Sequence, residues 1–276
     1  MTRPADSDRR RHTNPYQQGS EMTTYDTATR AVQIPAWTRG TVLKVWAAAA
    51  LPMGILAWVV APLLARAFSG PTALPRALIL SLATGLIWQF FLVLIVVRRE
   101  QGTLSWPVVK AALWLQAPRS PSSGRVGGRL WLVLVPCVLI FGAEEFIPGF
   151  SPAAGHDLPT FMESAAGAQL LSGHWTWFAV ITTLVLFNTV LGEELLFRGL
   201  LLPRMRGAFG RGDWVANGVL FAVYHLHLPW AIPTALLDIL ALSYPSRRYR
   251  SALIGIAVHS AQSVVILALA LSLVLR

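Results

Sequence analysis

Residues 77–97 read ALILSLATGLIWQFFLVLIVV, a run of 21 residues without one charged side chain. At 1.5 Å per residue, a helix of this length spans about 32 Å, slightly more than the roughly 30 Å hydrocarbon core of a bilayer. Residues 45–65, VWAAAALPMGILAWVVAPLLA, form a second uncharged run of 21 residues. Both runs therefore predict helices that cross a membrane.

Further apolar segments extend this pattern to the C-terminus. Residues 251–275 form a third long run without a formal charge, with His259 inside it. Four shorter or weaker apolar segments lie at 130–143, 175–192, 214–224 and 230–243. We therefore expect an all-α fold, a polytopic transmembrane helical bundle with about seven to eight membrane helices.

The composition excludes other protein classes. Of 276 residues, 54% are hydrophobic and only 13% are charged, whereas an ordinary soluble domain carries about 25% charged residues. A soluble fold of this composition would expose far too much apolar surface. The single cysteine, Cys137, excludes a disulfide framework and a metal site built from several cysteines.

The positive charge is explained by membrane orientation. The formal net charge is +10, and 20 of the 23 Lys and Arg residues lie in the stretches 1–44, 98–129, 198–211 and 247–250. The alternate loops hold only Arg66 and Arg76, so the positive-inside rule predicts a cytoplasmic N-terminus and no nucleic-acid partner. The ratio of 21 Arg to 2 Lys is typical of a GC-rich bacterial genome, and we expect a multi-pass protein of a bacterial plasma membrane.

Three regions are predicted along the chain. Residues 1–40 are polar and rich in Arg, Thr, Asp and Gln, which favours a disordered cytoplasmic tail. Residues 41–127 hold the first membrane helices and an amphipathic connection, in which Pro107 opens a short helix that ends near Leu115. Residues 128–276 are expected to form a C-terminal membrane core.

Ionisable residues inside the apolar segments of this core mark the candidate site. Placing an ionisable side chain at membrane depth costs at least about 2.5–3.5 kcal/mol, so each of these residues is a candidate functional residue. They are Glu193, Glu194, Arg198, His225, His227, Asp238 and His259. We expect His227 near the external interface, and Asp238 beside His227 or Arg247 or facing a water-filled cavity.

Helical spacing separates the two glutamates. Glu194 and Arg198 are four residues apart, about 40° around a helix, and can form an ion pair. Glu193 lies about 140° from Arg198 and is left available. A carboxylate held at the end of an apolar run suits general-base work on water.

Two other segments add histidines. Phe221 and His225 share one helical stripe, so the ring can wall the imidazole off from lipid. His259 is followed one turn later by Gln262 and Ser263, and these three side chains are donors that can hold an oxyanion.

These motifs resemble those of a known family. Residues 193–198 read EELLFR and match E-E-x-x-x-R, residues 221–225 match F-x-x-x-H, and His259 opens a motif of the H-x-x-x-N type. In this order they resemble the CPBP family of CAAX proteases and bacteriocin-processing Abi enzymes, which includes the type II CAAX prenyl endopeptidases. Ser263 stands where the family usually has Asn. Glu144-Glu145 does not match, because Gly149 stands at the arginine position.

The resemblance implies an intramembrane endopeptidase that acts on a membrane-associated peptide or protein in the lipid bilayer. Glu193 with His225 would activate water, Glu194 would pair with Arg198, and His259 with Ser263 or Gln262 would stabilise the oxyanion. A metal-free glutamate mechanism is favoured over zinc; if a metal is present, Glu193, His225 and His259 are its expected ligands.

Two non-proteolytic functions are the alternatives. One is a non-catalytic immunity or scaffolding protein that binds a peptide in its bundle. The other is a small transporter with Glu193, His225 and Asp238 as a proton relay, although the sequence has no internal symmetry that would favour it.

Overall fold

The computed structural model describes residues 32–147 and 150–276, and within these ranges the chain is helical and contains no β-strand. The α-helices are α1 (Arg39–Ile55), α2 (Ala61–Ala65), α3 (Ala73–Gln101), α4 (Trp106–Ala112), α5 (Leu134–Gly142), α6 (Leu158–Glu163), α7 (Ala165–Leu171), α8 (Trp175–Leu186), α9 (Leu202–Arg204), α10 (Arg206–Phe209), α11 (Asp213–Tyr224), α12 (Tyr244–Tyr249) and α13 (Ala252–Val274). The all-helical prediction is confirmed for these residues.

Shorter helical turns join or extend these helices. The π-helical turns are η1 (Leu56–Val60), η4 (Phe187–Gly192), η5 (Leu195–Leu201) and η9 (Ile239–Ser243). The 3-10 turns are η2 (Gly128–Val133), η3 (Ala143–Phe146), η6 (Gly210–Gly212), η7 (Pro229–Ala231) and η8 (Thr234–Leu237).

Four helical stretches in the described residues are long and apolar enough to cross a membrane. They are Arg39–Ala65, Ala73–Gln101, Trp175–Arg204 and Ala252–Val274, with 23 to 30 residues each. A helix of 23 residues reaches about 35 Å, which is sufficient for the hydrocarbon core. The chain is therefore an integral membrane protein, as the uncharged runs predict.

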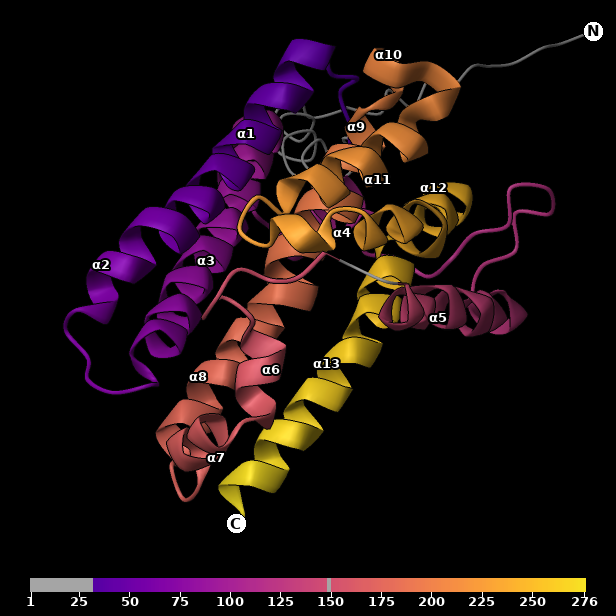
Figure 1. Cartoon of the computed structure of the whole chain (residues 1–276). Helices are drawn as coiled ribbons and strands as arrows, with labels where there is room; N and C mark the ends of the chain where they lie inside the picture. The colour runs from indigo at the N-terminus through magenta and orange to yellow at the C-terminus, as the bar shows by residue number, and fades with distance from the viewer. Residues whose placement is uncertain (1–31, 148–149) are drawn as a thin grey trace, which may run out of the picture. The chain divides into compact units, whose positions relative to one another are not determined.

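The other three predicted crossings fall on shorter elements. Residues 130–143 correspond to η2 and α5, residues 214–224 to α11, and residues 230–243 to η7, η8 and η9. In Figure 1, α5 runs across the direction of α13, whereas α3 and α8 run along it. The total of seven crossings stays a prediction.

Packing joins the N-terminal helices to the C-terminal core. α3 packs against α1, α8 and η4, while α13 packs against α5 and α8. The start of α1 is fixed by its N-cap, because the Thr38 hydroxyl accepts a hydrogen bond from the Thr41 amide at 3.2 Å. Trp37, within the predicted 1–40 tail, is 8% exposed, and its amide donates to the Arg204 carbonyl, so this residue is packed against the rest of the chain. Residues 1–31 of the predicted tail lie outside the described residues.

Two connections between the long apolar stretches are helical, and the first of them is the one predicted from Pro107. α4 begins at Trp106, with Pro107 in its first turn, and ends at Ala112, about one turn earlier than predicted. The segment near 160–171 forms α6 and α7, each with a side-chain N-cap. Asp157 accepts from the Thr160 amide, and Ser164 accepts from the Gly167 amide.

Candidate active site

Glu193 and Glu194 lie in the stretch Trp175–Arg204, between the π-helical turns η4 and η5. A π turn inserts one extra residue into a helix and occurs frequently at functional sites. Glu193 is 2% exposed and Glu194 is fully buried. Two adjacent carboxyl groups are thus held inside a membrane helix whose hydrogen-bond pattern changes on both sides of them.

Glu194 forms the centre of a buried charged cluster. Its Oε1 atom accepts a hydrogen bond from Nη1 of Arg198 at 2.9 Å, and both side chains are fully buried. The ion pair predicted from the four-residue spacing is therefore present. The same Oε1 atom lies 3.2 Å from Nδ1 of His259 on α13. Because a paired carboxylate can only accept, Nδ1 is the donor, and Nε2 is the ring atom left free for other contacts.

Gly255 makes room for this cluster. It lies on α13, one turn before His259, and a Cβ atom at this position would overlap Oε2 of Glu194 and lie 3.1 Å from Cγ of Arg198. Only a glycine lets α13 approach the carboxylate this closely.

Glu193 faces a different partner, as its position on the helix predicts. Its carboxyl group contacts the hydroxyl of Tyr224, at the end of α11. That hydroxyl also accepts a hydrogen bond of 2.6 Å from Nε2 of Gln89, and both Tyr224 and Gln89 are fully buried. Oε2 of Glu193 has no protein partner. One oxygen of the candidate base is thus free for water or substrate. The sequence reasoning missed Tyr224 and Gln89.

His225 is held in a defined orientation. Its Nδ1 atom donates to the Phe221 carbonyl at 3.0 Å, because a carbonyl oxygen can only accept, so Nε2 keeps its lone pair. The Phe221 ring meets the His225 ring edge to face at 5.0 Å, and the Arg198 guanidinium lies 4.0 Å from the centroid of Phe221. Phe221 thus forms a wall between the charged cluster and His225.

A cavity of about 310 Å³ brings the predicted catalytic residues together. Glu193, His225 and His259 all line it, and they come from three separate segments of the chain. Glu194 and Arg198 do not line it but hold His259 from behind. The arrangement supplies a carboxylate with a free oxygen and two imidazoles with free Nε2 atoms around one space.

Ser263 is not brought to this cavity. It is 6% exposed, and its hydroxyl donates to Oγ1 of Thr189 on η4 at 2.9 Å. Gln262, the neighbouring alternative, does line the cavity. The Ser263 hydroxyl is thus used in packing α13 against η4, and its expected role at the oxyanion stays a prediction.

Four acidic residues that the motifs did not include also line the cavity: Glu144, Glu145, Asp157 and Asp238. Glu144, on η3, contacts the carboxyl group of Asp238, which is 2% exposed. The neighbouring Glu145 lines the cavity as well. The pair Glu144-Glu145 does not match the motif, yet both residues lie at the cavity.

The expected partners of Asp238 lie elsewhere. Arg247 pairs with Asp213 at 2.6 Å, so it does not neutralise Asp238. His227 is 6% exposed and stacks on His225, with 5.5 Å between ring centroids, and its place near the external interface stays a prediction. The expectation that remains for Asp238 is the cavity, which it does line.

The residues present do not form a metal-binding group. In the part of the chain that the structure describes, no three His, Cys, Asp or Glu side chains lie close enough together to hold a metal ion. The expected ligands Glu193, His225 and His259 share the cavity without meeting this condition. The metal-free mechanism stays a prediction.

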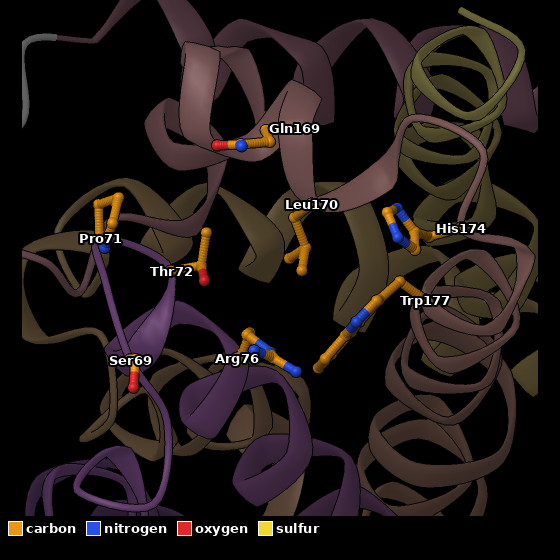
Figure 2. Close-up of a pocket in the computed structure, with 8 residues that line it drawn as sticks. All are labelled: Ser69, Pro71, Thr72, Arg76, Gln169, Leu170, His174 and Trp177. Atoms are coloured by element: carbon orange, nitrogen blue, oxygen red, sulfur yellow. The ribbon is translucent and has the colours of Figure 1, made fainter.

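A second cavity, of about 390 Å³, lies away from these residues. Figure 2 shows the Arg76 and Trp177 side chains pointing toward each other across it, with Thr72 and His174 at its edges. The Arg76 guanidinium lies 5.1 Å from the centroid of the Trp177 ring and 4.5 Å from that of Phe68. None of the predicted catalytic residues lines this second cavity.

Comparison with known proteins locates the site within a family. Residues 174–265 match the family model described as Type II CAAX prenyl endopeptidase Rce1-like. The matched segment contains all three motifs, from Glu193 to His259, so the family resemblance of the sequence is confirmed. No curated protein and no solved structure gives a match.

Proposed function

Since residues 174–265 belong to the CAAX proteases of the Rce1-like family, we propose that this protein is an intramembrane endopeptidase. It hydrolyses a peptide bond in a membrane-associated peptide or protein. The observation that carries the proposal is the convergence of Glu193, His225 and His259 on one cavity from three segments of the chain. The family match favours this function over a non-catalytic scaffold.

Glu193 acts as the general base. Its free Oε2 atom accepts a proton from a water molecule, which attacks the carbonyl carbon of the scissile bond. The lone pair on Nε2 of His225 accepts the second hydrogen bond of that water and orients it. When the C–N bond breaks, Glu193 returns its proton to the leaving amine nitrogen, so the carboxylate is regenerated.

His259 and Gln262 stabilise the oxyanion of the tetrahedral intermediate. In its doubly protonated form, His259 donates from Nδ1 to Glu194 and from Nε2 to the oxyanion. The Gln262 amide is the second donor, because it lines the cavity whereas Ser263 does not. The Glu194–Arg198 pair fixes the imidazole and supplies no atom to the reaction itself.

The mechanism needs no metal ion. A glutamate that takes and returns one proton, with two donors on the oxyanion, accounts for every proton and bond in the hydrolysis. The orientation is part of the proposal too: seven crossings with the basic loops in the cytoplasm, in a bacterial plasma membrane. The alternation of basic loops supports it.

The decisive variant is Glu193→Gln, which keeps the size of the side chain and removes the base. We expect it to abolish cleavage, whereas Glu163→Gln, an exposed carboxyl on α6 outside the cavity, keeps it. Peptides from membranes of cells carrying each variant are compared by mass spectrometry with those of the wild type. Peptides that depend on the wild type reveal the substrate, and unchanged peptides in Glu193→Gln cells contradict the proposal.

A further inference from the structure

The cavity is lined by more acidic residues than the proposed hydrolysis requires. Beyond Glu193, four acidic residues line it, namely Glu144, Glu145, Asp157 and Asp238. No lysine or arginine is among its lining residues. A cleft lined by charges of one sign concentrates ligands of the opposite sign.

Among these acidic residues, Asp238 is the one whose burial is hardest to explain by a structural role. It is 2% exposed, and its Oδ1 atom has no hydrogen-bond partner, nor has Oε1 of its neighbour Glu144. The contact between the two carboxyl groups leaves one oxygen of each without a partner. Buried polar atoms without a partner are costly, so two of them at one place point to a ligand that supplies hydrogen-bond donors.

No lysine or arginine lines the cavity to supply these donors. Arg198 does not line it and is paired with Glu194 in a fully buried ion pair, and the cavity-lining His259 donates from Nδ1 to the same carboxylate. Arg247 is paired with Asp213. No group of three ligating side chains is present among the described residues, which disfavours a metal ion as the ligand.

We propose that the Glu144–Asp238 pair binds a basic side chain of the substrate, so that this enzyme cleaves beside a lysine or arginine. The inference rests on the proposed function for its substrate, and extends it to specificity. The cavity of about 310 Å³ has room for roughly ten waters at ~30 Å³ each, which is sufficient for such a side chain. An ammonium or guanidinium group gives the free oxygens of both carboxyl groups a charged donor.

The test uses the full chain, purified and reconstituted in lipid nanodiscs, with synthetic peptide libraries. Each library is random except at one central position, fixed as Lys, Arg, Gln or Glu. We expect the Lys and Arg libraries to be cleaved at least about tenfold faster than the Gln library, and the Glu library slowest, because opposite charges near a buried site attract by more than about 1.4 kcal/mol.

The double variant Glu144→Gln with Asp238→Asn keeps the shape of the pair and removes its charge. It should reduce the preference for Lys over Gln to less than about twofold while the Gln library is still cleaved. Glu163→Gln removes one carboxylate outside the cavity and is the matched control, which should keep the full preference. If the double variant does not fold, Asp238→Asn alone is measured.

A binding experiment tests this inference separately from the proposed function. Fluorescent Lys and Gln libraries are titrated onto the inactive Glu193→Gln protein, with and without the double substitution. Tighter binding of the Lys library, weakened by salt and lost in the combined variant, supports the inference even where cleavage is absent. Equal binding of both libraries overturns it, and cleavage without preference for a basic residue overturns it while leaving the endopeptidase in place.

Discussion

At the scale of single residues, one oxygen atom of Glu194 holds two motifs together. Oε1 binds Arg198 from its own helical stretch and His259 from α13. Removing one partner of a buried ion pair leaves the other charge without compensation, which costs much more than the loss of an exposed pair. The two adjacent glutamates should therefore respond differently to the same substitution.

We predict that Glu194→Gln destabilises the protein as well as inactivating it. Arg198 keeps its charge in a fully buried position, so the free energy of unfolding should fall by about 3–5 kcal/mol. Glu193→Gln removes an oxygen that has no partner and should change stability by less than about 1 kcal/mol. Denaturant unfolding in detergent measures both, and equal stability of the two variants would contradict the assignment of roles.

The sequence predicts contacts within one helix better than contacts between helices. The Glu194–Arg198 pair follows from spacing alone, because residues four apart lie on one face. Tyr224 meets Glu193, and Asp238 meets Glu144, only through tertiary packing of segments far apart in the chain. Ser263 is a further example. The sequence predicts on which face of its helix Ser263 lies, but not its contact with Thr189, which lies on another helix.

At the scale of helices, the approach of α13 to the charged cluster depends on Gly255. We predict that Gly255→Ala lowers stability by about 1–3 kcal/mol and reduces cleavage, because its methyl group overlaps Oε2 of Glu194. Gly142→Ala is the control: it lies at the end of α5 with no neighbouring atom near its Cβ position, and should be neutral or slightly stabilising. Unfolding midpoints and peptide cleavage compare the two. A Gly255→Ala protein as stable and active as Gly142→Ala would show that α13 can retreat without consequence.

The long helices were predictable and the π turns were not. An uncharged run of 21 residues marks a membrane helix by length and polarity alone. The turns η4 and η5 insert extra residues around Glu193 and Glu194, whereas the spacing argument assumes a regular 3.6 residues per turn. No residue type marks such an insertion in advance, because it is set by how the helix packs against α3 and α13.

At the scale of the whole molecule, the distribution of basic residues predicts on which side of the membrane each loop lies. We predict that the loop before α3 and the loop after it lie on opposite sides of the bilayer. In a Cys137→Ala background, Ser69→Cys should react with a membrane-impermeant thiol reagent in intact cells, and Ser123→Cys only after permeabilisation. Both positions are exposed, so access depends on the side of the membrane. Labelling of both from the same side would contradict a crossing by α3.

The place of His259 in the chain has a consequence for biosynthesis. α13 follows every other element that lines the cavity, so a ribosome makes it after Glu193 and His225. Under the proposed mechanism, a chain that lacks α13 has no donors for the oxyanion opposite Glu193 and cannot cleave itself or its neighbours. Membrane insertion of α13 would then be the step that completes the proposed active site.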